Sequence, residues 1–591
     1  MDANKKLGML RNLMAEYRLD AYVVSNADPH FSEYLPERYR QIRWLTNFSG
    51  SNALVLVTND QALLWTDGRY FVQAEKEIAG SEFKMMKMAT PGYPNIYQMI
   101  GKLLPEGRRL GVDRAILSQA DYEKYEEISN KNGIDLVDDH DLISEIWTDR
   151  PEITKNPAYV HDLKFAGKSA QEKIQELRDL LKEAGAQGTI ISSLVDVAWL
   201  YNIRGTDIAN NPVVTAYAYV DQTSANIFID EEKLSLEILD HFKENGVDYL
   251  KYSEVFAKAN NLRNMTLLLD KKTSARSIFK VLDDSVKVID SIDLTTKLKA
   301  IKNDLEIKNQ KHAYIKDGVA LTKFIYWLKH HENIETEDEY TVGEKLEEFR
   351  KAQEYYVEPS FDTIAAYKEN AAMMHYKASQ AGAKKLAREG FLLVDSGGQY
   401  YDGTTDTTRT IALGDLSDEE KKDFTLTLKG HMDLMNTVFL QGTTGFALDA
   451  ICRRPLWLNR SDYKSGTGHG VGFFLGVHEG PQSISPRPGG AALETSMVVT
   501  IEPGVYKEGK HGIRTENVAI VVEDEKNLDG QFLSFECMSF VPIDIDAIDP
   551  SLLNDQDKKY INDYHKAVYE KISDYLTREE AAWLKEVTRA I

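Results

Sequence analysis

An internal repeat in the first half of the chain is the feature that most constrains its fold. The segment LRNLMAEYRLDAYVVS, from Leu10, matches LRDLLKEAGAQGTIIS, from Leu177, and each pattern is typical of a helix that leads into an apolar strand. Further on, RWLTNFSG and AWLYNIRG share a Trp-Leu-x-Asn pattern that includes Trp44 and Trp199. Two α/β units can share helix-strand patterning by chance, but the matched Trp-Leu-x-Asn pairs favour duplication. We therefore expect two related α/β domains.

The chain has 591 residues, which is more than one hydrophobic core usually spans. We place the two repeat copies near residues 1–157 and 158–303, and a third domain at 304–591. The third domain begins with the strongly helical NDLEIKNQKHAYIKDGVALTKFIYWLKHHENI, and short strands and turns follow. Further helices are expected over roughly 418–440, at ALDAICRRPLWL and in the polar tail, where TREE forms a possible capping box.

The overall charge and the cysteine count narrow the function classes. The formal net charge is -22, which argues against nucleic acid or an anionic membrane as a main partner, because phosphate groups need a basic surface. The two cysteines, Cys452 and Cys537, cannot form a disulfide framework and fit a reducing compartment. The N-terminus has no uninterrupted apolar core of a signal peptide, and no apolar run approaches transmembrane length. We therefore expect a soluble cytoplasmic protein.

A segment of the third domain places acids where the pattern predicts a buried strand. The segment LVDSGGQYYDGTTDTTRT contains Asp395, Asp402 and Asp406, and FLLVD before the first turn is apolar enough for a core strand. Unpaired carboxylates in such a place are costly, and a bound metal ion offsets that cost. Asp402 precedes a glycine and is explained by turn chemistry. Asp395 and Asp406, eleven positions apart, are the metal-ligand candidates.

Three further candidates lie downstream in the same domain. His469 belongs to SGTGHGVGFFLGVHEG, Glu502 to VVTIEPGVY and Glu516 to GIRTENVAIVV, and each acid ends or interrupts an apolar strand pattern beside Gly or Pro. Singly, each candidate has a structural explanation, such as a turn cap, a strand end or a structural histidine. Together with the two aspartates they suit a pair of divalent ions, Mn²⁺ above all, with Zn²⁺ or Co²⁺ also tolerated.

These residues and their motifs resemble the dinuclear-metal peptidases of the pita-bread fold, which include methionine aminopeptidase, prolidase and aminopeptidase P. The matching motifs are DGTTDTTRT, GTGHGVG, VHEGP, IEPGVY and GIRTENV. WTDGRYF, at residues 65–71, is similar to the first domain of long-form aminopeptidase P, and SFDTIAAYKENAAMMHY to the start of its catalytic domain. The resemblance implies an α/β protein in which two creatinase-like α/β domains precede a pita-bread (α+β) catalytic domain.

The resemblance also implies a role for each metal-site candidate. Asp395 binds one ion, Asp406 and Glu516 bridge both ions, and His469 and Glu502 complete the other. A hydroxide that bridges the metals attacks the scissile carbonyl, and Glu502 serves as general base and acid for the proton of the water.

Three other residues match substrate-contacting positions of the family. His375 and His478 are expected to contact substrate and the tetrahedral intermediate, where charge develops on the carbonyl oxygen. Arg69 matches an arginine that contacts the peptide, although a surface strand residue is the simpler explanation. Ser465 stands where the family often has a second histidine, so it could weaken substrate binding or change preference. Because the metal ligands are unaffected, we do not expect loss of activity.

The function that this resemblance implies is a metal-dependent Xaa-Pro aminopeptidase, a homodimer that acts on peptides with proline at the second position. A proline amide has no N–H, so a dedicated apolar pocket is the physical basis of such specificity. Prolidase, which cleaves Xaa-Pro dipeptides, is the nearest alternative, but it usually has one N-terminal domain. A non-catalytic peptide-binding relative and creatinase, which needs no metal, are disfavoured because all five ligands match.

Overall fold

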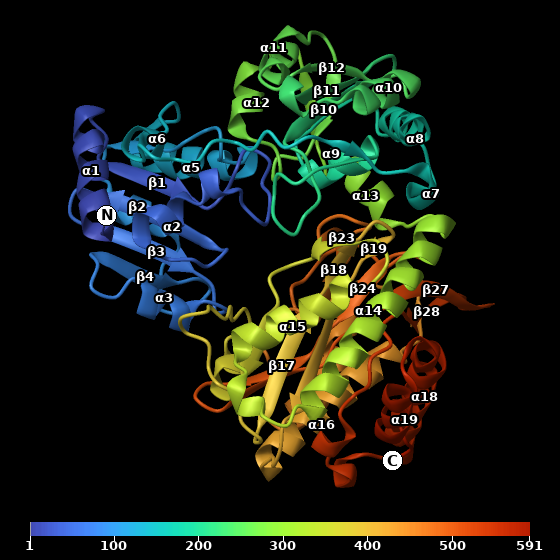
Figure 1. Cartoon of the computed structure of the whole chain (residues 1–591). Coiled ribbons are helices and arrows are strands. Elements are labelled where there is room, and N and C mark those ends of the chain that lie inside the picture. The colour runs from blue at the N-terminus through green and yellow to red at the C-terminus, as the bar shows by residue number, and fades with distance from the viewer. Residues whose placement is uncertain (1) are drawn as a thin grey trace. The chain divides into compact units, whose positions relative to one another are not determined.

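The computed structural model describes residues 2–591 and divides the chain into two compact units (Figure 1). Unit 1 comprises Met1–Val160, Lys168–Ala209 and Val213–Thr295, and contains both repeat copies. Unit 2 comprises His161–Gly167, Asn210–Pro212 and Thr296–Ile591. The domain boundaries given above stay a prediction, because this division joins the two copies into one unit.

Each repeat copy forms a six-stranded mixed sheet. The first sheet has, in spatial order, β4 (Phe83–Lys87), β3 (Ala62–Thr66), β2 (Ala53–Thr58), β1 (Ala21–Ser25), β5 (Arg109–Gly111) and β6 (Asp135–Val137). The second has β12 (Asp248–Lys251), β11 (Ala225–Ile229), β10 (Ala216–Asp221), β8 (Gly188–Ile191), β13 (Thr266–Leu269) and β14 (Lys287–Asp290). In both sheets the first strand of the copy pairs antiparallel on one side and parallel on the other. The identical strand order confirms the predicted repeat.

The helices of unit 1 also follow the repeat. The first copy contains α1 (Ala3–Glu16), α2 (Gln41–Thr46), α3 (Phe71–Glu77), α4 (Ile96–Leu103), α5 (Gln119–Asn132) and α6 (Leu142–Ile146). The second contains α8 (Ala170–Glu183), α9 (Leu194–Leu200), α10 (Leu236–Glu244), α11 (Glu254–Asn261), α12 (Arg276–Val281) and α13 (Leu294–Ala300), the last of which extends into unit 2.

The matched tryptophans of the two copies occupy the same structural position. Lys6 on α1 donates a hydrogen bond to the backbone oxygen of Trp44, and Lys173 on α8 donates to that of Trp199 over 2.9 Å. Each lysine Nζ also lies over the indole ring, 5.1 Å from the ring centroid of Trp44 and 4.4 Å from that of Trp199. A shared lysine contact of this kind is not expected from common patterning alone, and it supports duplication.

Unit 2 is built from several sheets with helices packed around them. Two sheets carry the predicted site. The first contains β16 (Ile364–Tyr367), β17 (Phe391–Ser396) and β20 (Thr407–Ala412). The second contains, in spatial order, β21 (Phe439–Leu440), β28 (Gly530–Cys537), β27 (Asn517–Asn527), β24 (Val498–Ile501), β22 (Gly468–Gly470) and β23 (Glu479–Ile484). Smaller sheets contain β15 (Tyr356–Pro359), β18 (Gly398–Tyr400) and β19 (Gly403–Thr404), and the hairpin of β25 (Gly504–Lys507) and β26 (His511–Arg514).

Five helices of unit 2 match the predicted segments: α14 (Asp304–His330), α16 (Asp418–Met435), α17 (Gly445–Leu458), α18 (Asp555–Ile572) and α19 (Arg578–Val587). Unit 2 also contains α15 (Glu339–Lys351) and the short helix α7 (Leu163–Ala166). The capping box before α19 is confirmed, because Thr577 and Glu580 each accept from the other's backbone N–H. Figure 1 shows α18 and α19 beside α14, against which both helices pack. Among the residues described, no helix is both long and apolar enough to cross a membrane.

Candidate metal centre

The structure places all five predicted ligands at or near strand ends in unit 2. Asp395 lies on β17, Asp406 immediately before β20, His469 on β22, Glu502 immediately after β24, and Glu516 immediately before β27. Strand ends fix the backbone on one side of each ligand, while the adjoining turn lets its side chain converge with the others.

Three of these side chains meet within bonding range of one ion. One ligand atom each of Asp406, His469 and Glu516 lies within 4.8 Å of the other two. His469 Nε2 lies 3.6 Å from Asp406 Oδ2 and 3.6 Å from Glu502 Oε1. Nδ1 of the same ring lies 2.8 Å from the backbone oxygen of Gly470. If Nδ1 carries the proton, the Nε2 that faces the carboxylates is the nitrogen with a lone pair for a metal.

Asp395 joins the group through a network of hydrogen bonds. Arg514 Nη2 donates to Asp395 Oδ2 over 2.5 Å, and Arg514 Nε donates to Thr408 Oγ1 over 3.2 Å. Thr408 Oγ1 in turn donates to Glu516 Oε2 over 2.7 Å. In the antiparallel pair of β17 and β20, Asp395 lies directly opposite Thr408. Sheet register therefore sets the position of Asp395 beside Glu516.

The electrostatics of this group call for a cation. Burial, and then the charges of the neighbouring carboxylates, raise the pKa values of Asp406 and Glu516 well above their usual range. Burial also raises the pKa of Glu502 to about 7, against the opposing charge of Arg514. Arg514 does not neutralise four acids, so the ionised form of the cluster needs further positive charge.

The donor set fits a pair of divalent metal ions. Asp395 Oδ1 is buried and has no hydrogen-bond partner among the residues described, while its other oxygen accepts from Arg514. A buried carboxylate oxygen without a donor is costly unless an ion binds it. Four carboxylates and one imidazole are ligands that Mn²⁺, Zn²⁺ and Co²⁺ accept. Asp395, Asp406, His469, Glu502 and Glu516 are therefore the residues that would hold the metals.

The glycines around His469 allow β22 to lie between its neighbours. A Cβ atom on Gly468 would lie 1.9 Å from the backbone oxygen of Thr500, and one on Gly470 would lie 2.3 Å from that of Glu479. No side chain fits at those separations, so the GTGHGVG pattern is required by the close approach of β23 and β24. The same packing holds His469 near Glu502.

A buried histidine on α16 connects two of the ligand strands. His431 Nδ1 lies 3.0 Å from the backbone oxygen of Ile501, and Asn517 Nδ2 lies 3.1 Å from His431 Nε2. Ile501 precedes Glu502, and Asn517 follows Glu516. Burial, followed by the charge of Arg409, lowers the pKa of His431 to about 3, so the ring is neutral and donates from one nitrogen while it accepts at the other. His431 could not be identified from the sequence, because a single histidine in a helical segment belongs to no motif of regularly spaced residues.

Arg409, the arginine of the DGTTDTTRT motif, holds the start of β27 from the other side. Its Nη1 donates to the backbone oxygen of Glu516 over 2.6 Å, and its Nη2 donates to Asn517 Oδ1 over 2.7 Å. The side chain is buried. Arg409 is thus a residue that fixes the backbone at a metal ligand.

Asp402 does more than the turn chemistry predicted for it. Its buried carboxylate accepts from Lys316 Nζ over 2.6 Å and lies 2.7 Å from His312 Nδ1. Both partners are on α14, so Asp402 ties the β18–β19 turn to that helix and does not lie among the metal ligands.

The other predicted residues occupy different surroundings. His478 is exposed, and its ring centroid lies 4.3 Å from that of His469 in an edge-to-face arrangement. His375 is exposed in the loop that follows the short 3-10 helix Lys368–Ala372. The Ser465 hydroxyl is buried with no hydrogen-bond partner among the residues described, and its backbone oxygen accepts from Arg453.

Arg69 lies in unit 1, in the loop between β3 and α3, and not on a strand. Its guanidinium makes a two-point contact with Asp67, from Nε to Oδ1 over 3.0 Å and from Nη2 to Oδ2 over 2.7 Å. Asp67 therefore holds Arg69 in one orientation, although the role of Arg69 toward a peptide stays a prediction.

Comparisons with known families agree with this organisation. The family description "Creatinase/Prolidase N-terminal domain" matches residues 6–146 and again residues 149–306. "Metallopeptidase family M24" matches residues 308–523, and "C-terminal region of peptidase_M24" matches residues 531–591.

Similar proteins cover the whole chain. A protein of Pyrenophora teres f. teres named probable Xaa-Pro aminopeptidase P is 37% identical over 610 residues, covering 100% of this chain and 93% of the relative. Aminopeptidase P2 of Arabidopsis thaliana is 36% identical over 630 residues, covering 100% and 88% respectively. The crystal structure of X-prolyl aminopeptidase from Caenorhabditis elegans, described as a cytosolic enzyme with a di-nuclear active site, matches with TM-score 0.95 and 35% identity over 100% of both chains.

The fold and the site together define a metallopeptidase, and the chain belongs to family M24. Within that family it belongs with the three-domain relatives named Xaa-Pro aminopeptidase P. The predicted fold class, two creatinase-like domains before a pita-bread catalytic domain, is confirmed, as is the prediction that the chain is an enzyme of this family.

Proposed function

We propose that the protein is a dinuclear-metal Xaa-Pro aminopeptidase that releases the N-terminal residue of peptides with proline at the second position. The observation that carries this proposal is the convergence of Asp406, His469 and Glu516 within 4.8 Å, with Glu502 3.6 Å from His469. Relatives that match the full length of the chain are named for the same activity. A catalytic role is favoured over peptide binding alone, because all five residues expected to bind the metals are present.

The metals are two divalent ions, for which we favour Mn²⁺ on the strength of the carboxylate-rich ligand set. The solved relative with a di-nuclear active site supports the number two. When bound, such ions activate a shared water molecule as the nucleophile and polarise the scissile carbonyl.

Glu502 is the proposed general base and acid. Its Oε1 lies 3.6 Å from His469 Nε2, so it would lie beside a water molecule held by the metals and within reach of that water's proton. Glu502 takes the proton of the attacking water and delivers it to the proline nitrogen as the Xaa-Pro bond breaks. The free amino acid and a peptide with N-terminal proline are then the products.

The histidines and Arg69 are proposed to bind the substrate. His478 lies edge-on to His469 and is exposed, so it can donate to an oxygen of the bound peptide or of the tetrahedral intermediate. His375 is given the same kind of role on the strength of its motif. Arg69, oriented by Asp67, is proposed to contact the peptide.

We further propose a cytoplasmic homodimer. The solved relative is described as a cytosolic enzyme. On α17, Phe446, Trp457 and Leu458 are 45%, 47% and 61% exposed, and such an apolar surface suits a two-fold contact with a second copy. Light scattering with Trp457→Glu tests this: conversion of a dimer to a monomer supports it, and a wild-type protein that is monomeric at micromolar concentration contradicts it.

The activity is tested with protein stripped by chelator and reloaded with Mn²⁺. An Xaa-Pro dipeptide and a longer Xaa-Pro-Xaa peptide are offered, and release of the first residue is followed by chromatography. We expect cleavage of the longer peptide, loss of that cleavage in Glu502→Ala, and no loss in Glu494→Ala, which changes an exposed acid outside the site. Cleavage of the dipeptide alone would assign prolidase activity, and absence of both cleavage and bound metal would leave a binding protein.

A further inference from the structure

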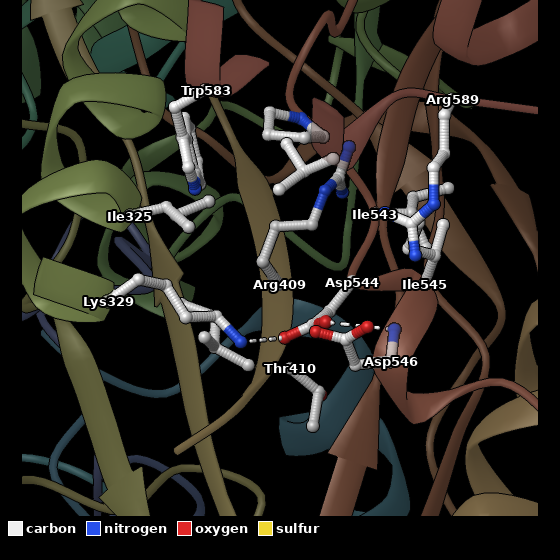
Figure 2. Close-up of a pocket in the computed structure, with 13 residues that line it drawn as sticks. Ile325, Lys329, Arg409, Thr410, Ile543, Asp544, Ile545, Asp546, Trp583 and Arg589 are labelled. Carbon is white, nitrogen blue, oxygen red and sulfur yellow. Dashed lines mark hydrogen bonds and ion pairs between the residues drawn. The ribbon is translucent and has the colours of Figure 1, made fainter. Parts of the chain in front are cut away.

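Unit 2 contains a pocket whose lining includes none of the five metal-ligand candidates (Figure 2). It has a volume of about 100 Å³ and is formed by α14, β20, the segment after β28, and α19 with the residues that follow it. Its lining includes Ile325, Lys329, Arg409, Asp544, Asp546 and Trp583.

Arg409 supplies an unsatisfied donor to this pocket. It follows Thr408 on β20: Thr408 Oγ1 donates to Glu516 Oε2, whereas Arg409 lines the pocket together with Thr410 and Ile411. Arg409 is 3% exposed. Its Nη atoms donate to several acceptors, but its Nε is buried and has no acceptor among residues 2–591. A buried N–H of this kind is costly when unpaired, so a ligand oxygen that accepts from it would be stabilised.

The other charged residues of the lining form two groups, a hydrogen-bonded pair inside the pocket and two exposed residues at its entrance. Lys329 Nζ donates to Asp544 Oδ2 over 2.6 Å, and the same carboxylate accepts from the backbone N–H groups of Ala412 and Asp546. That pair is therefore already balanced. Asp546 and Arg589 are exposed and place one charge of each sign at the entrance, where Arg589 Nη1 also lies 3.2 Å from Glu586 Oε1.

The walls between these charges are apolar. Ile325 and Trp583 come from the two helices, and Pro542 and Ile543 from the segment after β28. In Figure 2 the guanidinium of Arg409 lies between Trp583 and Arg589, and the carboxylates of Asp544 and Asp546 lie below it. The pocket thus has a cationic end at Arg409 and Arg589, an acidic end at Asp544 and Asp546, and an apolar wall between them.

We propose that this pocket binds a free, compact, apolar α-amino acid such as valine. The carboxylate of the ligand accepts from Arg409 Nε and faces Arg589, its ammonium faces Asp546, and its side chain packs against Ile325 and Trp583. Under the function proposed above, such an amino acid is one of the two products, so the pocket would sense product; that interpretation of the source rests on the proposed function, whereas the binding does not. Arg409 also holds the backbone oxygen of Glu516, so occupancy of the pocket and binding of metal are expected to influence each other reciprocally.

The test is isothermal titration of the metal-free full-length protein with L-valine, because removal of the metals suppresses binding of the amine at the metal centre. We expect saturable binding to one site, at least tenfold weaker for isovalerate, which lacks the ammonium, and for isobutylamine, which lacks the carboxylate. Val587→Trp, which fills the pocket, should abolish valine binding, and Lys585→Trp, on the same helix outside the lining, should not.

Asp546→Asn changes an exposed side chain and tests the ammonium contact without filling the pocket; we expect at least threefold weaker valine binding. The proposal is overturned if valine does not bind saturably, if Val587→Trp leaves its affinity unchanged in folded protein, or if isovalerate binds as tightly as valine. Peptide cleavage by Mn²⁺-loaded Val587→Trp is measured in parallel. Failure of cleavage in the wild type would reject the proposed function without touching the valine result.

Discussion

Arg514 Nη2 donates to Asp395 Oδ2 over 2.5 Å, which places a buried guanidinium directly against a cluster of four carboxylates. The same guanidinium bonds Thr408, which bonds Glu516. The charge of Arg514 thus opposes the rise in pKa that burial causes at Asp406, Glu502 and Glu516. One guanidinium balances one of the four carboxylates, so the ionised cluster keeps a net negative charge that metal ions would neutralise.

Replacement of Arg514 by Met should destabilise the metal-free protein by about 3 kcal/mol at pH 8, since it leaves Asp395 buried without its charge partner. The loss should be smaller at pH 5, because the pKa values of Asp406, Glu502 and Glu516 are raised by burial and these three carboxyls are then protonated. Urea unfolding of the metal-free protein at both pH values measures this, with Arg454→Met as a control for loss of an arginine elsewhere. An equal loss at pH 5 and pH 8 would contradict the electrostatic explanation.

Metal binding should release protons and strengthen with rising pH. In the metal-free protein the pKa of Glu502 is raised to about 7, and those of Asp406 and Glu516 are raised well above their usual range. Ions must therefore displace protons below these values, and apparent Mn²⁺ affinity should rise by about tenfold per pH unit for each proton released. Titration calorimetry in two buffers of different ionisation enthalpy counts these protons; a buffer-independent heat at pH 6 would rule the coupling out.

The same raised pKa gives the opposite trend for stability without metal. A carboxyl whose folded pKa lies above its unfolded value of 4.5 stabilises the fold fully below that value, and this contribution is lost as pH rises through 7. Metal-free protein should therefore lose stability between pH 5 and pH 8, and Glu502→Gln should flatten that loss. Thermal unfolding across this range checks the prediction, which fails if the variant and the wild type show the same slope.

Sequence patterns indicated the metal-ligand candidates because each acid interrupts an apolar strand, and because the glycines beside His469 are required by backbone contacts. The repeat was equally visible, since Trp44 on α2 and Trp199 on α9 occupy the same position in the two copies. These are local signals, in which a few neighbouring residue types are fixed by one strand end or one turn.

The supporting residues could not be found in this way. His431 contacts the backbone oxygen of Ile501, 70 positions away, and any segment offers such an oxygen. Asp402 looked like a turn residue because its partners, Lys316 and His312, lie on a helix about 90 positions earlier. The sequence showed Arg409 only as part of the DGTTDTTRT motif and gave it no role. The pocket that it lines is formed by segments far apart in the chain. Contacts of this kind depend on the assembled fold.

His431 should make the protein sensitive to acid. Its folded pKa is about 3 and its ordinary value is 6.5, so the unfolded state binds a proton that the folded state excludes between these values. The resulting stability is present above pH 6.5 and is lost as pH falls toward 3, by about 1.4 kcal/mol per pH unit. His431→Gln should remove this slope and also weaken Mn²⁺ binding about tenfold, because Glu502 and Glu516 lose a shared support. His140→Gln, which replaces a half-exposed histidine of unit 1, is the control. If His431→Gln loses as much stability between pH 6.5 and pH 3 as the wild type does, His431 is not the cause of the acid sensitivity.

The glycines of the GTGHG segment provide a final test, because two of them differ sharply in the space around them. A Cβ atom on Gly468 would lie 1.9 Å from the backbone oxygen of Thr500, whereas on Gly466 the nearest atom is 3.4 Å away. Gly468→Ala must push β22 from β24 and displace His469, so we expect a loss of about 2 kcal/mol or more in stability together with loss of tight Mn²⁺ binding. Gly466→Ala should change both by little. Equal behaviour of the two variants in urea unfolding and metal titration would show that the spacing of β22 and β24 does not position His469.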